Sequence, residues 1–358
     1  MRNRTHFLNS MAAVPIDYNL GAGVPPLNLY PPLNLSELVG LFSVESNDKT
    51  INYHETGGYI TSTAQNFIEV TENIDFEINN IIITNGVQEA ISLAIACFKN
   101  EQFACIEPSY PGFEDAALSF GCKPIKLSAE NWLNEIEKLP ENALLYLSAD
   151  FSNPTGKSLT FEERLRLLKI AESKKFYIFD DATYRPFNLE DAKPSLISLN
   201  KERVIHAISF SKILAPGLRT AFVYLPDSLK SSFVGHKSNL SLNNSGITQK
   251  IIKEWLNHQK FSLDKQLYLI KERLNRNKRI LKSHGIDYFG GFFCLLKLDR
   301  VVDYYFCETL LIRKKIAIIP MILFSDDPKY LNQARICVAN IDENDLEFVL
   351  NEIRKFEP

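Results

Sequence analysis

The sequence predicts an α/β protein in which a mostly parallel sheet is covered by helices on both faces and is followed by a smaller α+β unit. Three observations support this prediction. Short apolar segments alternate with segments of helical periodicity from about residue 80 onward. The apolar segments are hydrophobic throughout, as expected for strands buried on both faces. After about residue 235 the pattern changes to long charged helical segments and a few isolated strands.

The composition is that of a globular protein. The 358 residues are 45% hydrophobic and 23% charged, with a formal net charge of −3. Because this length exceeds that of an average domain, we expect two domains or one large domain with an appendage. The near-neutral charge provides no basic surface, so neither nucleic acid nor an anionic membrane is expected as a partner.

The six cysteines predict a reducing compartment. No two of them form a Cys-x-x-Cys pair, and most lie in apolar stretches, so we expect buried free thiols rather than disulfides or a metal site. The N-terminus lacks the apolar stretch of a signal peptide. The longest apolar run, residues 316–324, is too short to cross a bilayer and contains Pro320. These features predict a cytoplasmic protein.

Residues 1–40 are expected to form an N-terminal arm and a segment of the small domain. Their glycines and prolines prevent long regular elements, so the arm must lie on another part of the protein: Gly21, Gly23, Pro25, Pro26, Pro31 and Pro32. The large domain is expected over residues 41–235. Its predicted strands are 81–84, 103–106, 144–147, 177–179, 204–208 and 221–225, with helices over 87–98 and 160–174. Thr160 and Glu163 have the spacing of a capping box.

The small C-terminal α+β domain is expected over residues 236–358. Residues 247–281 form a long, charged helical segment, and 343–355 have helical spacing as well. The segments 294–298, 316–319 and 334–339 have the pattern of strands.

A lysine lies where one of the predicted buried strands ends. Ser209-Phe210-Ser211-Lys212 follows strand 204–208, and open α/β sheets bind ligands at this edge. A lysine there can be desolvated, and its lowered pKa allows imine chemistry with an aldehyde. Arg219 is suited to phosphate, and the two serines add hydroxyls. The alternative is a solvated lysine and arginine on a loop.

Four further segments lie at strand ends or in loops: Gly86-Val87-Gln88, Glu107-Pro108-Ser109-Tyr110, Ser152-Asn153-Pro154-Thr155-Gly156, and Asp180-Asp181-Ala182-Thr183-Tyr184. The first joins a strand to a helix, whose N-terminal N–H groups favour an anion. The last places two acids at a buried strand end, which is unfavourable unless one has a cationic partner. Taken singly, each segment is also compatible with an ordinary turn or loop.

Together these segments resemble the fold-type I pyridoxal-phosphate enzymes, in particular the class I and II aminotransferases. They occur in the same chain order, and the resemblance extends from about Asp17 to the C-terminus. It implies pyridoxal 5′-phosphate as the cofactor. By this resemblance Lys212 forms the internal aldimine with the cofactor and then acts as general base and acid.

The resemblance also assigns the cofactor contacts. Gly86, Val87 and Gln88 form the phosphate loop, and Ser209, Ser211 and Arg219 complete the phosphate site. Tyr110 stacks on the pyridine ring, while Asn153 and Tyr184 reach its phenolic oxygen. Asp181, chosen over Asp180 by its spacing of three to Tyr184, faces the pyridine nitrogen and keeps it protonated.

Four residues, among them Asn153 a second time, are assigned to the substrate and the partner subunit. By the resemblance Arg335 clamps the substrate carboxylate beside Asn153, and Gly23 belongs to a loop next to the substrate. The alternative for Arg335 is an edge-strand arginine in solvent. Tyr53 is similar to a tyrosine that crosses a dimer interface to the neighbouring phosphate, which implies a homodimer.

The implied function is an aminotransferase that moves an amino group between an amino acid and a 2-oxo acid. The same site could serve a decarboxylase, lyase, cyclase or oxidase. A non-catalytic pyridoxal-phosphate-binding sensor is the third alternative, but it needs a DNA-binding domain, and the residues before the fold do not have a helix-turn-helix pattern. Two departures from the family are Ala221, where glycine is frequent, and the bulky residues 321–324 after Pro320, which argue against a polar or acidic substrate.

Overall fold

The computed structural model describes residues 7, 15–25, 27–30, 49–98, 101–188, 193–257 and 263–358. Its centre is a seven-stranded sheet of order β2-β8-β7-β6-β5-β3-β4. The strands are β2 (Ile81–Thr84), β3 (Phe103–Glu107), β4 (Ile125–Ser128), β5 (Leu144–Leu147), β6 (Tyr177–Asp181), β7 (Val204–Ser209) and β8 (Ala221–Tyr224). β8 runs antiparallel to both neighbours, and the other pairs are parallel. The mostly parallel sheet predicted from the sequence is therefore confirmed.

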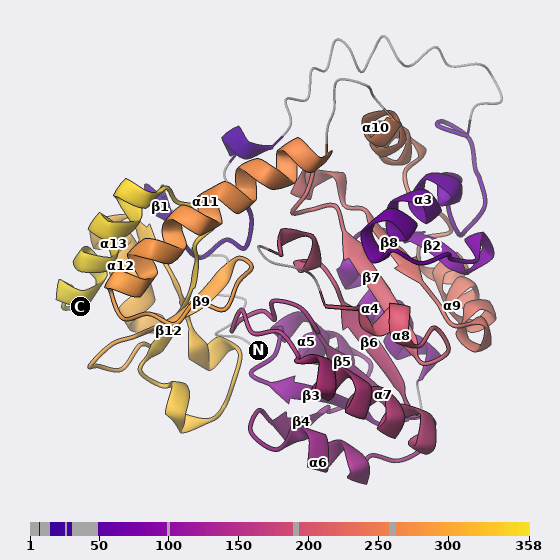
Figure 1. Cartoon of the computed structure of the whole chain (residues 1–358), viewed down its shortest axis with the longest axis horizontal. Coiled ribbons are helices and arrows are strands. Elements are labelled where there is room, and N and C mark those ends of the chain that lie inside the picture. Colours follow the sequence, from indigo (N-terminus) through magenta and orange to yellow (C-terminus); the bar gives the residue numbers. More distant parts are fainter. Residues whose placement is uncertain are drawn as a thin grey trace.

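Helices cover both faces of this sheet (Figure 1). Leu145 and Leu147 of β5 belong to one core cluster, while Leu144 and Tyr146 between them belong to the other. The first cluster includes residues of α3 (Thr61–Glu72), α6 (Trp132–Glu135), α7 (Phe161–Lys174) and α8 (Leu196–Leu199). The second includes residues of α4 (Val87–Cys97), α5 (Pro111–Ser119) and α9 (Asp227–Leu240). Burial on both faces explains why the strands are apolar throughout.

The start of α7 follows the predicted capping box. The Glu163 N–H donates to Thr160 Oγ1 at 3.1 Å, and the Thr160 N–H donates to the Glu163 carboxylate at 2.7 Å. These two bonds satisfy N–H groups that have no partner inside the helix.

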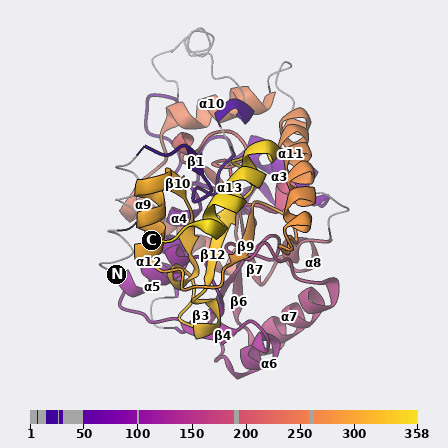
Figure 2. The ribbon, with the colours of Figure 1, turned by 90° about the vertical axis from the view of Figure 1, so that its left-hand side faces the viewer.

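The smaller unit contains a three-stranded antiparallel sheet of order β11-β12-β9. Its elements are α11 (Leu263–Ser283), β9 (Phe293–Lys297), α12 (Tyr304–Lys314), β10 (Ile316–Ala317), β11 (Ile319–Pro320), β12 (Gln333–Cys337) and α13 (Glu343–Lys355). The preceding helix α10 (Gly246–Asn257) instead contacts the segment before α3, where Gln249 Oε1 accepts from the Tyr59 N–H at 3.0 Å. The helical segment predicted over 247–281 thus falls on two helices, and residues 258–262 lie outside the described part. In Figure 2 this unit faces the viewer, and α11 packs beside α13.

The described part of the arm lies on the C-terminal unit of its own chain. Its strand β1 (Tyr18–Asn19) pairs in parallel with β10, with Tyr18 opposite Ile316. The Leu20 N–H donates to Ala317 O at 2.9 Å, and the Cys337 N–H donates to Leu20 O at 2.7 Å. These bonds bring Gly21 to Gly23 next to β12.

Short 3₁₀ turns join several elements: η1 (Leu27–Leu29), η2 (Ile78–Asn80), η3 (Ile136–Lys138), η4 (Arg185–Phe187), η5 (Pro216–Leu218), η6 (Met321–Leu323) and η7 (Pro328–Tyr330). The described helices include none that is long and apolar enough to span a membrane. All strands of the large sheet lie within 41–235 and all strands of the three-stranded sheet within 236–358. The domain boundaries themselves stay predictions.

Candidate active site

A pocket opens at the carboxyl ends of the parallel strands. It is lined by Gly23, Val87, Gln88, Tyr110, Asn153, Asp181, Thr183, Tyr184, Ser209, Ser211, Lys212, Arg219 and Arg335. All of these except Thr183 were singled out from the sequence. The chain therefore brings residues from the arm and the small unit to the carboxyl edge of the large sheet, where open α/β sheets bind ligands.

Lys212 lies in the turn that follows β7, where it borders the pocket. Burial lowers the pKa of Lys212 to about 8, and the positive charges of Arg335 and Arg219 act in the same direction. Part of the lysine population is therefore neutral near neutral pH. A neutral amine can attack an aldehyde or accept a proton.

One end of the pocket has the geometry of an anion cradle. Gly86 caps α4 with a φ of 80°, and a Cβ atom there would lie 2.6 Å from Arg219 Nη2. Arg219 donates to Ser211 Oγ at 3.3 Å and to Asn85 O at 3.4 Å. The Ser211 N–H donates to Ser209 Oγ at 3.2 Å. Although it does not line the pocket, Gly86 allows the guanidinium to approach the helix N-terminus closely.

Ala221 fits its position in spite of the family's preference for glycine. It begins β8, and it is not among the residues with positive φ. The left-handed conformation is adopted by Arg219 instead, with a φ of 47°. Alanine at 221 therefore causes no backbone strain.

The two adjacent acids of β6 point to opposite faces of the sheet. Asp181 lines the pocket, whereas Asp180 contacts His206 on the other side at 3.2 Å. Asp181 accepts from Tyr146 Oη at 2.9 Å and from Thr183 Oγ1 at 2.5 Å. Because these partners are neutral, burial raises the pKa of Asp181. A cation in the pocket would supply the charge that this carboxylate lacks.

Tyr110 is held by a short chain of hydrogen bonds. Its hydroxyl donates to Gln88 Oε1 at 3.1 Å, and Gln88 Nε2 donates to Gly112 O at 2.9 Å. The tyrosine is also the N-cap residue of α5, so its backbone is fixed by that helix. These contacts give the ring a defined position at the wall of the pocket.

Arg335 is a buried cation with neutral partners. It donates from Nη1 to Asn153 Oδ1 at 3.0 Å and from Nη2 to Gly21 O. Within the described part of the chain, its Nε has no hydrogen-bond partner. The guanidinium lies over the rings of Phe293 and Phe324, at 4.5 and 5.1 Å from their centroids. This arrangement excludes the alternative of a solvated edge-strand arginine.

Gly23 provides room that a larger residue would remove. A Cβ atom there would lie 2.6 Å from Phe293 Cζ and 2.9 Å from Tyr184 Oη. The Tyr184 hydroxyl donates to Gly23 O at 3.4 Å. The arm therefore closes tightly over this side of the pocket.

Tyr53 does not line the pocket of its own chain, and 85% of its surface is exposed. The apolar loop that was expected near the substrate is largely core. Met321, Leu323 and Phe324 belong to the larger core cluster, and Phe324 also lies against the pocket residue Arg335.

Sequence reasoning missed several residues around the pocket. Thr183 and Tyr146 hold Asp181, and Tyr30 donates to the backbone oxygen of Ser211 at 3.4 Å. Cys337 lies two residues after Arg335 on the same strand, so that period-two alternation places both side chains on one face. Thr183, inside the Asp-x-x-Tyr motif, and Cys337 could have been found from their spacing. Tyr146 and Tyr30 have no local signal.

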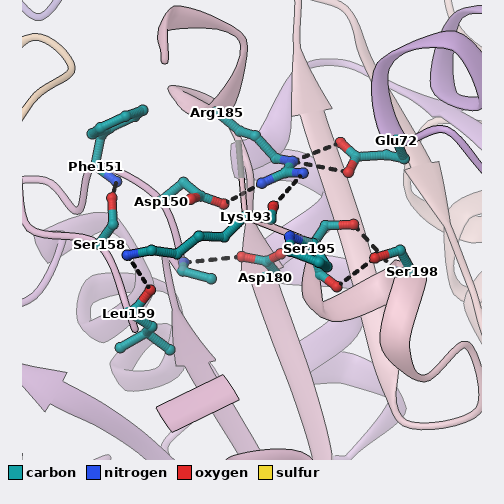
Figure 3. Close-up of polar contacts among 12 residues, drawn as sticks. Glu72, Asp150, Phe151, Ser158, Leu159, Asp180, Arg185, Lys193, Ser195 and Ser198 are labelled. Atoms are coloured by element: carbon teal, nitrogen blue, oxygen red, sulfur yellow. Dashed lines mark hydrogen bonds and ion pairs between the residues drawn. The ribbon is translucent and has the colours of Figure 1, made fainter. Parts of the chain in front are cut away.

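A buried ionic network lies next to the pocket (Figure 3). Arg185, which follows Tyr184, contacts Glu72 at 2.8 Å and Asp150 at 2.8 Å. Asp150 also pairs with Arg164 at 2.6 Å. Asp180 accepts from the Ala149 N–H at 3.1 Å (Figure 3). The network thus ties together the segments that carry pocket residues.

The pocket suits an aromatic aldehyde that carries a phosphate group. The cradle at Gly86 and Arg219 fits the phosphate, a lysine of lowered pKa faces the pocket, and the neutral surroundings of Asp181 leave a place for a protonated ring nitrogen. A mostly parallel sheet with these groups at its carboxyl edge defines a pyridoxal-phosphate enzyme of fold type I.

Comparison with known proteins gives the family. The family model "Aminotransferase class I and II" matches residues 35–353. The chain belongs to the class I and II aminotransferase family. It is a pyridoxal-phosphate-dependent aminotransferase, whose substrates are amino acids and 2-oxo acids.

The relatives that match the sequence include transcriptional regulators and a transaminase. The chain is 25% identical over 332 residues to the HTH-type transcriptional regulator NorG of Staphylococcus aureus, covering 87% of this chain and 74% of that protein. It is 28% identical over 282 residues to a 2-aminoadipate transaminase of Thermus thermophilus, covering 75% of this chain and 69% of that protein.

Solved structures share the fold. An archaeal alanine:glyoxylate aminotransferase superposes with a TM-score of 0.87 at 22% identity, covering 99% of this chain and 94% of that one. The α-aminoadipate aminotransferase LysN of Thermus thermophilus superposes with a TM-score of 0.83 at 24% identity, covering 99% and 93%. These likenesses confirm the fold class.

Proposed function

We propose that the pocket is the transamination site and that Lys212 is its catalytic residue. The observation that supports this proposal most directly is the burial of Lys212 beside Arg335 and Asp181 at the sheet edge. When bound, pyridoxal phosphate supplies an aldehyde and a ring that stabilises negative charge at the substrate α-carbon. Nζ of Lys212 takes the α-proton as a base and returns it as an acid.

The cofactor would be held by residues at or after the ends of five strands, β2, β3, β5, β6 and β7. Gly86, Val87, Gln88, Ser209, Ser211 and Arg219 would bind its phosphate. Tyr110 would pack on the ring face, and Asn153 and Tyr184 would donate to the phenolic oxygen. Asp181 would pair with the ring nitrogen, which gives this buried carboxylate its missing cation.

Arg335 would orient the substrate through its α-carboxylate, beside Asn153 and Gly23. Its present partners are a side-chain amide and a backbone carbonyl, both neutral acceptors. A carboxylate forms a stronger, bidentate pair with a guanidinium. The two flanking rings fix the plane of the guanidinium, so the substrate is held in one orientation.

We further propose a homodimer in which Tyr53 reaches the partner's phosphate site. His54 links this segment to the loop after α9 through Asn243 and Asn244, at 3.1 and 2.9 Å. Exposed apolar side chains on and next to these two segments support an interface: Ile51, Tyr53, Leu240, Leu242 and Ile247. The six free cysteines support a reducing compartment, and we propose the cytoplasm.

The test is an absorbance titration of the cofactor-loaded protein with L-glutamate and then with other amino acids. Conversion to the pyridoxamine form, reversed by a 2-oxo acid, is expected for at least one pair. Lys212→Ala should lower turnover by at least about a thousandfold with an unchanged circular dichroism spectrum. Lys169→Ala, at an exposed position of α7, is the matched control.

Robust turnover of Lys212→Ala would refute the assignment. The relatives named as transcriptional regulators supply a second candidate, a sensor that binds cofactor and effector without turnover. In that case amino acids would change the absorbance of the bound cofactor, yet no 2-oxo acid would be released.

A further inference from the structure

A lysine occupies a core position of α9. Leu229, Phe233 and Lys237 are spaced by four residues and form the buried stripe of this helix. The two apolar side chains belong to the core cluster that α9 shares with α4. The Lys237 side chain is 0% exposed. An apolar residue would be expected here, because a buried ammonium is unfavourable unless it is paired.

The partner of this ammonium is a carboxylate at the start of α4. Lys237 Nζ lies 3.4 Å from Glu89 Oε2 and 3.2 Å from Ser241 Oγ. Both carboxylate oxygens of Glu89 accept hydrogen bonds from Asn85, the residue before Gly86. Oε2 accepts from the Asn85 N–H at 2.5 Å, and Oε1 accepts from Asn85 Nδ2 at 3.1 Å.

The contacts continue from Asn85 to the anion cradle. The Asn85 carbonyl accepts from Arg219 Nη2 at 3.4 Å. The same nitrogen lies so close to Gly86 that a Cβ atom on that residue would be only 2.6 Å from it. A continuous chain of polar contacts therefore runs from the buried ammonium through Glu89 and Asn85 to the arginine of the cradle.

We propose that Lys237 is a positioning residue for the phosphate-binding turn. Its charge fixes the Glu89 carboxylate, which holds the backbone and side chain of Asn85 and thereby sets the approach of Arg219 to Gly86. The inference rests on the proposed function, in which this cradle holds the cofactor phosphate. Without the ammonium, the partly exposed Glu89 carboxylate turns toward solvent and the cradle loses its fixed geometry.

The test compares two ligands that differ only in the phosphate group. The full chain, freed of cofactor, is titrated with pyridoxal phosphate and with pyridoxal by equilibrium dialysis. Lys237→Met is expected to raise the Kd for pyridoxal phosphate on the order of tenfold, as is typical when the outer partner of a ligand-holding group is removed. The Kd for pyridoxal stays unchanged, because Lys212 and Asp181 are untouched.

Two further variants sharpen the test. Lys230→Met makes the same change on a half-buried residue of the same helix and leaves both Kd values unchanged. Glu89→Gln acts on the same chain of contacts, so it also raises the Kd for pyridoxal phosphate alone. If Lys237→Met does not fold, Glu89→Gln still tests the proposal.

The proposal is overturned if the ratio of the Kd for pyridoxal phosphate to the Kd for pyridoxal is the same in Lys237→Met, Glu89→Gln and the wild type. An ion pair of Lys237 and Glu89 that only stabilises the fold would lower stability without changing this ratio. Failure of the proposed function has a different signature. In that case Arg219→Ala leaves the binding of pyridoxal phosphate unchanged, and the wild-type chain does not prefer it to pyridoxal.

Discussion

At the residue scale, the site depends on charged groups that are buried but only partly neutralised. Arg335 and Lys212 share one pocket, and burial lowers the pKa of both. Asp181 has neutral hydrogen-bond donors, and burial raises its pKa. Burial thus disfavours the charged form of each group, although Arg335 stays a cation. A charged substrate and cofactor would supply opposite charges that offset the desolvation of these groups. Ligand binding is therefore coupled to the protonation of Lys212 and Asp181.

The lowered pKa of Lys212 predicts how cofactor uptake depends on pH. Only the neutral amine reacts, so the rate of covalent attachment of pyridoxal phosphate to the cofactor-free chain should rise about tenfold per pH unit and level off above pH 8. Stopped-flow absorbance between pH 6 and 10 measures this rate. Arg335→Met removes a neighbouring positive charge, so the midpoint should move to higher pH. A midpoint near 10, as for an exposed lysine, would contradict the burial argument.

At the element scale, the alternation of side chains along β6 places one acid in the pocket and the next in a buried ionic network. Asp181 faces the pocket, and Asp180 faces a buried network behind it. His206 of β7 lies between Asp180 and Glu72, at 3.2 and 3.4 Å. Burial alone would lower the pKa of His206, but the two carboxylates outweigh it and raise the pKa to about 9. The strands that carry the site are thereby tied together by ion pairs.

This network predicts a pH-dependent stability. The folded-state pKa of His206 lies above its ordinary value of about 6.5, so its contribution is fully present below that pH and is lost as the pH rises through 9. The contribution of His206 to the free energy of unfolding, measured as the difference between the wild type and His206→Gln, should fall by up to about 3 kcal/mol between pH 6 and 10. Urea unfolding of the cofactor-free protein measures it. His206→Gln should remove most of this slope, whereas His236→Gln, on α9, should retain it. Equal slopes in all three proteins would refute the assignment.

At the scale of the whole molecule, the pocket needs segments that are far apart in the sequence. Arg335 bonds to Asn153 of the large domain and to Gly21 of the arm. The pairing of β1 with β10 brings the arm to that place. Tyr53 does not line this pocket in its own chain. In the proposed homodimer, each site therefore takes residues from both subunits.

Subunit mixing tests this arrangement. Lys212→Ala and Tyr53→Ala should each have low activity at limiting cofactor, the first through lost chemistry and the second through weaker phosphate binding. After exchange of subunits, each mixed dimer contains one site with both residues intact, so activity should reappear. Sedimentation equilibrium should show a dimer for both variants. A monomeric wild type, or no recovery on mixing, would contradict a shared site.

The sequence by itself determined the fold class and nearly all residues of the pocket. Buried strands are apolar runs, and the residues after them, such as Lys212 and Asp181, come together because parallel strands end at one edge. Local signals also sufficed for the Thr160 capping box. They missed strand β4 and the helices α3, α5, α6, α8, α9 and α12, and they did not separate α10 from α11. Propensity is a weak signal that tertiary packing overrides at such elements.

Only the tertiary structure decided which partners each charge has. Glu72, Asp180 and His206 lie on different elements, and nothing local to any of them predicts the network. Nothing in the sequence around Lys237 distinguishes it from a solvated lysine. Its burial against Glu89 follows from how α9 packs on α4. The physical reason is that hydrophobic periodicity is a local property of the chain, whereas the cost and the compensation of a buried charge depend on all the groups that surround it in space.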